Sequence, residues 1–348
     1  MMAAFHEDLI RSTLSQVRYP GFSRDLVSFG LLKGIQITGT DVAVDLQITT
    51  ADATIPQAIR AASETALRAL PGIGKVTVQI QIHPPAAKAA AGPTAIAGVK
   101  HVIAIASGKG GVGKSTVAAN LALALAKTGA SVGLCDCDIY GPSIALMFGS
   151  RERAMATEDD QILPIQMAGL KLMSMGFLLD DTSPAVLRGP MVTRTTQQFL
   201  RQVEWGNLDF LILDLPPGTG DIQLTIVQTV VLAGAILVTT PQEVALIDVR
   251  KTASMFGKVN VPILGLIENM SYFLCPSDGK RYDIFGSGGG TREAKRLGVP
   301  LLGEIPLDIA TREAGDRGVP IVAADVESAV SQAFITSATL IRSTLSSS

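Results

Sequence analysis

The residues whose types and spacing most clearly indicate chemistry lie at positions 102–116, which read V-I-A-I-A-S-G-K-G-G-V-G-K-S-T. An apolar run predicts a buried strand, glycines follow it, and Lys114 and Ser115 open an Ala/Leu-rich segment typical of a helix. Glycines allow successive backbone N–H groups to converge on phosphate oxygens, and a helix N-terminus adds a positive dipole end. The pattern predicts a phosphate-binding loop in which Lys114 binds the β and γ phosphates and Ser115 binds Mg²⁺. The residues expected to contact the nucleotide here are Gly108, Lys109, Gly110, Gly111, Val112, Gly113, Lys114, Ser115 and Thr116.

Two acidic stretches that follow predicted strands are further candidates. The first, D-C-D-I-Y-G-P-S, spans residues 136–143, and the second, D-L-P-P-G-T-G-D, begins at Asp214. An acid just beyond a strand end either caps a loop or helix or, opposite a phosphate loop, takes part in phosphoryl transfer. Because Asp221 already stands at the start of the next expected helix, we assign Asp214 to Mg²⁺ rather than to a cap. We interpret Asp138, the second acid of the first stretch, as catalytic.

The chain has three cysteines, Cys135, Cys137 and Cys275, which is too few for a disulfide framework at 348 residues. They are therefore thiols or metal ligands. Strand alternation places Cys135 and Cys137 on one side, which permits either a metal site or small core residues beside the acidic pair. Since no further ligand lies near this C-x-C, we interpret both as core residues.

Strands and helices are expected to alternate over the larger part of the chain. The candidate strands are residues 102–106, 131–136, 170–175, 210–213, 235–240, 263–268 and 301–305. Most are near-continuous runs of β-branched residues or leucine, which is typical of parallel strands buried on both faces. We predict an α/β fold whose mainly parallel sheet is covered by helices on both faces and binds its ligand at the carboxyl ends of the strands.

A small α+β domain is expected to precede this sheet. Helical spacing over residues 4–17 gives way to alternation over 41–50, then to a helix over 59–70 and a second alternation over 76–82. The next segment, up to residue 98, is rich in Pro, Ala and Gly and has no periodicity, as is typical of a linker. We predict a small domain over residues 1–83, a linker over 84–99 and a nucleotide-binding domain over 100–348.

The composition argues against several classes of function. Apolar residues make up 47% of the chain and the mean hydropathy is +0.36, but no uninterrupted apolar run is long enough to span a bilayer. The N-terminal segment includes Glu7 and Asp8 and lacks the features of a secretion signal, which predicts a cytoplasmic protein. A net charge of −2 and a pI of about 6.0 give no general attraction to nucleic acid. We therefore expect neither nucleic acid nor a membrane as a partner.

The segment K-G-G-V-G-K-S-T resembles the deviant Walker A loop of the MinD/ParA/Mrp group of P-loop ATPases. D-C-D-I-Y-G-P-S, D-L-P-P-G-T-G-D and R-G-P-M-V at residues 188–192 resemble the Mrp branch in particular, so the resemblance covers most of residues 100–340. It implies a slow ATPase that works as a homodimer, in which Lys109 reaches the partner's phosphates. It also implies that Asp138 orients the attacking water and that Asn269 binds adenine. The catalytic residues expected from pattern and resemblance together are Lys109, Lys114, Asp138 and Asp214.

A second part of this resemblance concerns an iron–sulfur cluster. Residues 269–279, N-M-S-Y-F-L-C-P-S-D-G, resemble the N-M-S-x-F-x-C-P-x-C stretch of Mrp proteins. In those proteins two cysteines from each subunit hold a four-iron four-sulfur cluster that bridges the homodimer. Cys275 matches the first cysteine, whereas Asp278 replaces the second. Because these clusters prefer thiolate ligands, Asp278 either completes an altered, labile site or marks the loss of the site.

The first 82 or so residues resemble the small domain that often precedes Mrp-type ATPases and occurs in iron–sulfur assembly factors. The matching stretch is D-L-V-S-F-G-L-L-K-G-I. In that family a cysteine often follows a T-T-P-A stretch, but residues 48–53, I-T-T-A-D-A, contain none. We therefore expect no metal ligand in this domain.

The resemblance favours an Mrp/ApbC-type ATP-dependent iron–sulfur cluster carrier, whose partners are a second copy, apo iron–sulfur proteins and a cluster assembly scaffold. One alternative is a ParA/MinD-like spatial regulator that binds DNA or a membrane. Residues 326–345 contain Arg342 as their only basic residue and make a poor membrane anchor, and the composition shows no basic patch for DNA. The other alternative is a regulatory ATPase that has lost its cluster on the same scaffold, for which Asp278 argues.

Overall fold

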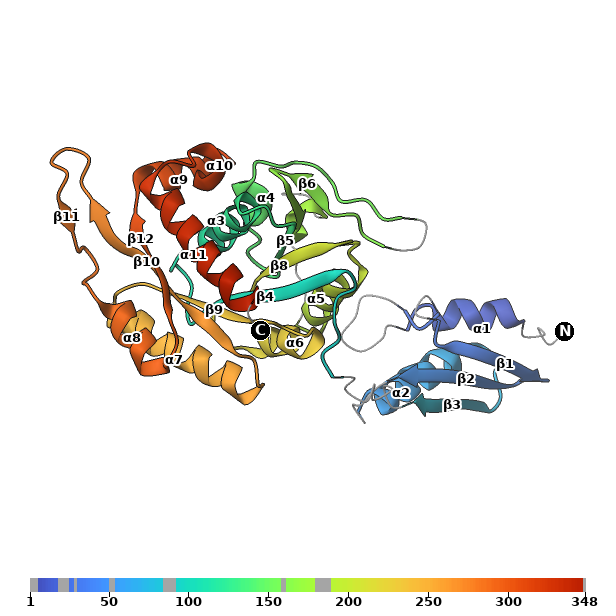
Figure 1. The fold of residues 1–348 in the computed structure, drawn as a ribbon. Coiled ribbons are helices and arrows are strands. Elements are labelled where there is room, and N and C mark those ends of the chain that lie inside the picture. Colours follow the sequence, from blue (N-terminus) through green and yellow to red (C-terminus); the bar gives the residue numbers. More distant parts are fainter. Residues whose placement is uncertain are drawn as a thin grey trace. The chain divides into compact units, whose positions relative to one another are not determined.

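The computed structural model of the chain describes residues 6–17, 25–27, 30–49, 54–83, 92–157, 161–178 and 189–346. The chain divides into two compact units, Met1–Ala91 and Gly92–Ser348 (Figure 1). Their buried apolar side chains form separate cores, one in the smaller unit and two in the larger. Within these described ranges, no helix is long and apolar enough to cross a membrane.

In its described residues, the smaller unit forms a three-stranded mixed sheet with two helices packed against it. Its elements are α1 (Glu7–Leu14), β1 (Leu32–Thr38), β2 (Asp41–Thr49), α2 (Thr54–Arg68) and β3 (Val76–His83). β2 lies in the centre, antiparallel to β1 and parallel to β3, and its alternating apolar side chains form the core. The sequence did not predict β1, because its residues are mostly half-exposed and its register shifts near Gly34.

The described part of the larger unit is built on a nine-stranded sheet. Its strands are β4 (Val99–Ser107), β5 (Val132–Asp136), β6 (Ile165–Met167), β7 (Leu170–Met173), β8 (Leu208–Asp214), β9 (Gly234–Thr239), β10 (Ile263–Leu274), β11 (Arg281–Tyr282) and β12 (Leu301–Leu307). The order is β11-β10-β9-β4-β8-β5-β7-β6, and β12 also pairs with β10. Only β6 and β11 run antiparallel to their neighbours among these strands.

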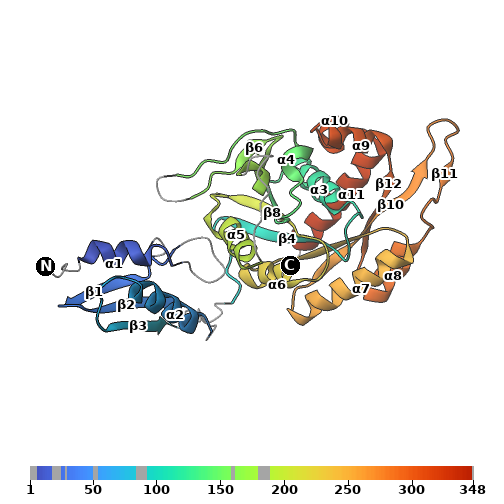
Figure 2. The ribbon, with the colours of Figure 1, turned by 180° about the vertical axis from the view of Figure 1, so that it is seen from behind.

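Helices cover both faces of this sheet. They are α3 (Lys114–Lys127), α4 (Ile144–Met147), α5 (Gly189–Gln202), α6 (Asp221–Thr229), α7 (Glu243–Lys258), α8 (Gly289–Leu297), α9 (Ile309–Asp316), α10 (Ile321–Ala324) and α11 (Ala329–Ser346), with a 3-10 turn at Met175–Phe177. The helices α3, α10 and α11 pack on one face (Figure 1), and α5 to α8 lie on the other (Figure 2). Side chains of β4 alternate between the two cores, with Ile103 and Ile105 in the first and Ala104 in the second. The predicted α/β fold with a mainly parallel sheet is confirmed.

β10 is longer than the sequence predicted. A strand was expected over residues 263–268 and a loop from Asn269, whereas β10 continues to Leu274. The polar residues Asn269 and Ser271 obscured this extension, which pairs with β12 and β11. The register shifts just beyond Asn269, where Met270 has a φ of +53°, which is uncommon for a residue with a side chain. This irregularity lets one strand carry both Asn269 and the hairpin that follows Leu274.

The segment that leads into β4 is paired with the larger unit. The backbone N–H of Thr94 donates to the Thr229 carbonyl, and the N–H of Val231 donates to the Thr94 carbonyl, each at 3.1 Å. Residues 92–98 of the expected linker therefore pack with the larger unit, and residues 84–91 lie outside the described ranges.

Gly98 allows a test of how tightly the start of β4 is fixed. Its φ is +78°, its carbonyl accepts the Leu208 N–H at 2.9 Å, and a Cβ here would overlap the Gly206 carbonyl oxygen. We expect Gly98→Ala to lower the free energy of unfolding by about 2–4 kcal/mol, measured by urea denaturation. Gly129→Ala is the control, because its φ is +86° but no atom lies near its added Cβ. Equal losses in the two variants would contradict the close contact at Gly98.

Candidate functional site

The phosphate loop connects β4 to α3, which begins at Lys114 with Gly113 as its N-cap. Gly111 and Gly113 have φ angles of +83° and +77°, a backbone conformation that favours glycine. A Cβ at Gly108 would overlap the backbone of Asp248 in α7. These glycines are therefore required by the turn of the loop and by the close approach of α7.

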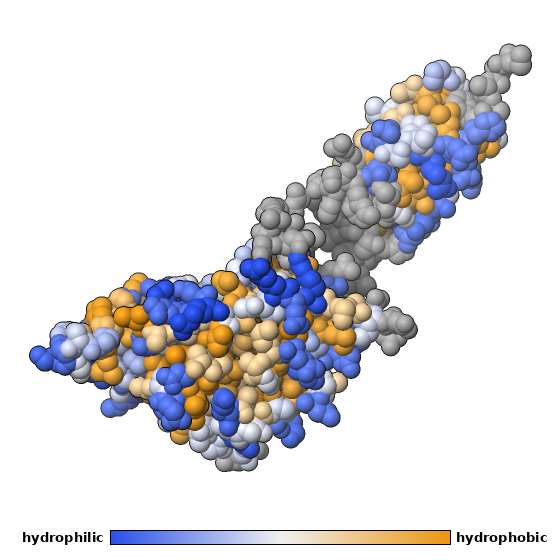
Figure 3. Space-filling model, turned by 90° about the horizontal axis from the view of Figure 1, so that it is seen from above, coloured by the Kyte–Doolittle hydropathy of each residue, from blue (hydrophilic) through white to orange (hydrophobic). Residues whose placement is uncertain are grey.

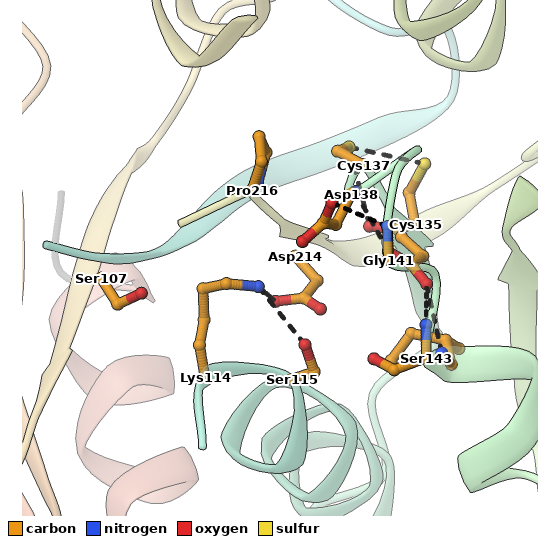
Figure 4. A network of polar contacts seen from close by, with 12 residues as sticks. Ser107, Lys114, Ser115, Cys135, Cys137, Asp138, Gly141, Ser143, Asp214 and Pro216 are labelled. Carbon is orange, nitrogen blue, oxygen red and sulfur yellow. Dashed lines mark hydrogen bonds and ion pairs between the residues drawn. The ribbon is translucent and has the colours of Figure 1, made fainter. Parts of the chain in front are cut away.

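A buried ion pair lies at the centre of the site (Figure 4). The Lys114 ammonium donates to Asp214 Oδ1 at 2.5 Å and lies 3.3 Å from Ser115 Oγ. The Lys114 side chain is only 7% exposed and that of Asp214 is fully buried. Burial raises the pKa of Asp214, and the positive charge of Lys114 opposes this shift. The other carboxylate oxygen, Asp214 Oδ2, has no hydrogen-bond partner among the described residues.

These groups fit a nucleotide with Mg²⁺. Mg²⁺ prefers oxygen ligands, and the unpaired Asp214 Oδ2 and the Ser115 hydroxyl are both oxygen donors. Lys114 and Ser115 line a cavity of about 340 Å³ that Asp138 and Pro217 also line. A buried acceptor without a partner costs roughly 1–3 kcal/mol. A cation that reaches this oxygen would therefore stabilise the loaded site.

The loop after β5 is held by Asp136, a residue that the sequence did not mark as part of the site. Its buried carboxylate accepts two backbone N–H groups at the start of α4, at 2.9 and 3.1 Å, and the Ser174 hydroxyl at 3.0 Å. Burial and the nearby charge of Asp214 raise the pKa of Asp136 to about 7. These bonds fix the loop that brings Asp138 to the phosphate cavity. The only sign of this role in the sequence was the position of Asp136 as the first acid of D-x-D.

Asn269 lies on β10 beside the phosphate loop. Its Nδ2 donates to the Val112 carbonyl at 2.8 Å, and the side chain is largely buried. A second cavity of about 300 Å³ adjoins the phosphate cavity, because Gly113, Thr116 and Met147 line both. Asn269 lines this second cavity, so the structure brings it next to the phosphate loop.

Lys109 lines the phosphate cavity and is half-exposed. Its backbone carbonyl accepts the Ser107 hydroxyl at 2.9 Å, which fixes the backbone but leaves the ammonium free to move. Across the ranges that the structure describes, this ammonium has neither a carboxylate partner nor a hydrogen bond.

Cys275 begins the turn between β10 and β11. Its N–H donates to the Lys280 carbonyl at 3.0 Å, and its half-exposed Sγ lies 3.0 Å from Ser277 Oγ. Asp278 lies in the same turn, where its two oxygens accept the Lys280 N–H at 3.0 Å and the Tyr282 hydroxyl at 2.8 Å. These hydrogen bonds, with that from Lys280 the stronger influence, lower the pKa of Asp278.

Cys135 and Cys137 are buried in the core beneath α5 to α7, with their sulfur atoms 3.9 Å apart. The hydrogen bond with Cys135, followed by burial, raises the pKa of the Cys137 thiol, which keeps it protonated and unreactive. Among the described residues, no group of three or more His, Cys, Asp and Glu side chains could hold a metal ion. The described part of a single chain thus offers no complete ligand set, either here or at Cys275.

A phosphate loop between a strand and a helix, with a buried acid at the end of the neighbouring strand, defines this protein as a P-loop NTPase. Residues 98–342 match the family described as NUBPL iron-transfer P-loop NTPase, and residues 7–80 match the iron-sulfur cluster assembly protein family. The chain belongs to the NUBPL iron-transfer P-loop NTPase family. This family membership confirms the resemblance to the Mrp branch that the motifs predicted.

A relative and two solved structures support this family assignment. The chain is 46% identical to the iron-sulfur cluster carrier protein of Synechocystis, over 94% of both chains. Its fold matches a nucleotide-binding protein from Archaeoglobus fulgidus solved with ADP, with a TM-score of 0.57, 39% identity and coverage of 63% of this chain and 87% of that one. It also matches the cell division ATPase MinD of Pyrococcus furiosus, with a TM-score of 0.56, 26% identity and coverage of 70% and 99%.

The buried Lys114–Asp214 pair can be tested by a double variant. Lys114→Met removes the phosphate-binding charge and leaves Asp214 buried without a counter-charge, so it should lose ATP binding and about 3–5 kcal/mol of stability. Adding Asp214→Leu should recover most of that stability but no ATP binding, because no buried charge remains. Urea denaturation and calorimetric titration with ATP and Mg²⁺ measure the two properties. Undiminished ATP binding by Lys114→Met would overturn the assignment of the phosphate loop.

Proposed function

We propose that this chain is an ATP-binding carrier that assembles or transfers an iron–sulfur cluster to apoproteins in the cytoplasm. The observation that carries the proposal is that one strand, β10, bears Asn269 beside the phosphate loop and ends immediately before the half-exposed thiol of Cys275. A strand fixed at the nucleotide and bearing a thiol at its end can couple the nucleotide to a metal cargo. Matches of both units to iron–sulfur families support this function. The expected donor of the cluster is a cluster assembly scaffold.

ATP hydrolysis at this site rests on positioning and charge. Backbone N–H groups of the phosphate loop and the Lys114 ammonium bind the β and γ phosphates. Ser115 and Asp214 would hold Mg²⁺, which supplies charge neutralisation at the phosphates when bound. Asp138, on the loop that Asp136 fixes, orients the attacking water. Together these residues suit the slow transfer of the γ-phosphoryl group to water.

Asn269 gives the second cavity a preference for adenine. One N–H of its Nδ2 donates to the Val112 carbonyl, which orients the amide, and Oδ1 remains available as a hydrogen-bond acceptor. Adenine presents an amino donor at its six position, whereas guanine presents a carbonyl oxygen there. An acceptor at this point therefore favours ATP over GTP.

The working form that we propose is a homodimer. Each chain supplies one cysteine in the turn after β10, so a cluster at Cys275 needs ligands from a second copy. Exposed apolar side chains on elements next to the phosphate loop, among them Leu146 and Val244 at 71% and 57% exposure, would be buried on association. On the face seen in Figure 3, apolar and hydrophilic groups are interspersed.

Complementation between two inactive variants tests whether Lys109 acts on the partner's phosphates. Lys109→Ala should bind ATP with nearly normal affinity but hydrolyse it about 10²–10³-fold more slowly, because one charge on the transition state is lost. A mixture of Lys109→Ala and Asp138→Ala should regain activity, since each mixed dimer contains one complete site. Steady-state phosphate release measures both effects. A mixture no more active than its components would remove the trans-acting lysine from the mechanism.

The cluster is the cargo of this proposed carrier. The Cys275 thiolates of two copies would bind it, and two Asp278 carboxylates or exogenous thiols would complete the ligand set. Asp278 is hydrogen-bonded to Lys280 and Tyr282, so these contacts must open before its oxygens can ligate iron. Carboxylate is also a harder ligand than thiolate. The cargo should therefore be held weakly, which suits transfer.

Iron and acid-labile sulfide analysis after anaerobic reconstitution tests the cargo site. Cys275→Ala should remove all bound iron and sulfide, whereas Cys135→Ala and Cys137→Ala should leave them, because those thiols are buried in the core. Asp278→Cys should make the cluster more resistant to chelators, since thiolate replaces oxygen. If the wild-type chain takes up no cluster while Asp278→Cys does, the carrier proposal fails.

The second candidate function is then a regulatory ATPase without a cluster on the same scaffold. It is favoured by one observation, which is that both Asp278 oxygens already accept hydrogen bonds within their own turn. A carboxylate satisfied in this way stabilises the hairpin without any metal.

A further inference from the structure

Gln223 is a buried amide in α6, the helix that follows the acidic loop after β8. Its side chain is only 1% exposed. Its Nε2 donates to the backbone carbonyl of Pro216, two residues beyond Asp214. Its Oε1 is buried and has no partner within the described residues. The amide is thus oriented by a single hydrogen bond, which it makes to the loop.

The hydrogen bond from Gln223 falls between two backbone contacts of the loop. Leu215 and Gly218 bind β4 through their own N–H groups, which donate to Ile105 and Ser107 at 3.1 and 3.0 Å. Between them, Pro216 and its neighbouring proline have no N–H group at all. The stretch between these two contacts is therefore held through the Pro216 carbonyl.

Packing does not explain an amide at position 223. A buried polar side chain with one unpaired atom stabilises the folded state less than an apolar side chain of the same shape would. An isosteric methionine would fill the same space without an unpaired oxygen. What the amide provides, and methionine cannot, is the hydrogen bond to Pro216.

The segment held by Gln223 faces the phosphates. Pro217 lines the phosphate cavity together with Lys114 and Asp138. The following part of the loop is anchored by the Gly218 N–H on Ser107, and no atom lies near an added Cβ at Gly218 or Gly220. The loop is therefore held at Leu215, Pro216 and Gly218, and open space adjoins its glycines.

We infer that Gln223 is a positioning residue for ATP hydrolysis, which holds Pro216 and thereby the neighbouring Pro217 at the wall of the phosphate cavity. This inference rests on the proposed ATPase function. ATP itself is bound by the phosphate loop and Lys114, which Gln223 does not touch. Loss of the clamp should therefore slow turnover without weakening nucleotide binding, because only the preorganisation of the cavity is lost.

The test is Gln223→Met, with Gln228→Met as the matched control on an exposed position of the same helix. We expect kcat to fall by about tenfold in Gln223→Met, with KM and ATP affinity within about twofold of wild type. The thermal unfolding midpoint should be unchanged or higher, because an unpaired buried oxygen is removed. Gln228→Met should match wild type in every measurement.

An unchanged kcat in Gln223→Met overturns the inference. A fall in kcat accompanied by weaker ATP binding and a lower unfolding midpoint also overturns it, because that pattern shows a structural role. Amide hydrogen exchange of residues 218–220 in the ATP-bound proteins provides a readout that does not depend on turnover. It should be about tenfold faster in Gln223→Met, since the clamp limits local opening; equal exchange counts against the clamp. If the wild-type chain hydrolyses no ATP, the proposed ATPase fails while the exchange result still decides the role of Gln223.

Discussion

The site depends on one interaction, the buried ion pair between Lys114 and Asp214, which are 100 residues apart in the chain. The pair forms because β4 and β8 are neighbours in the sheet and Asp214 stands opposite Ile105, near the point where β4 turns into the phosphate loop. Removing two charges from water is costly, and such a pair adds little to stability compared with apolar residues of similar size. A pair in this place therefore fits a role in nucleotide binding better than a role in stability.

Around this pair, the sheet brings several loops to one edge. The strands β4, β5, β8 and β9 are parallel, so their carboxyl ends lie side by side, and Asp136 pairs directly with Asp214 in the register of β5 and β8. Burial raises the pKa of both carboxyl groups, and repulsion from Asp214 raises that of Asp136 further. The lysine charge and the hydrogen bonds to Asp136 offset this repulsion. The site therefore contains several charged side chains, and backbone N–H groups hold Asp136 in place among them.

β10 gives the molecule a physical link between two kinds of chemistry. Glu268, fully buried, accepts the Ser271 hydroxyl at 2.6 Å and the backbone N–H of Gly290 at the start of α8. These bonds hold the strand on both sides of the irregularity at Met270. Asn269 is thereby fixed against the phosphate loop, and the hairpin with Cys275 extends from the same strand. β10 thus joins the nucleotide site and the Cys275 hairpin in one continuous strand.

The sequence by itself determined the phosphate loop, the acids after two strands and the α/β class, because glycine spacing and β-branched runs are local consequences of backbone geometry. It also located Cys275 and showed that Asp278 stands where the Mrp motif has its second cysteine. It did not locate β1, the extension of β10 or the roles of Asp136 and Gln223. Only the tertiary structure decided these features. Pairing with β12 places polar residues in a strand. The role of the buried Gln223 amide depends on its hydrogen bond to the Pro216 carbonyl, seven residues away. Contacts of this kind leave no periodic signal in the chain.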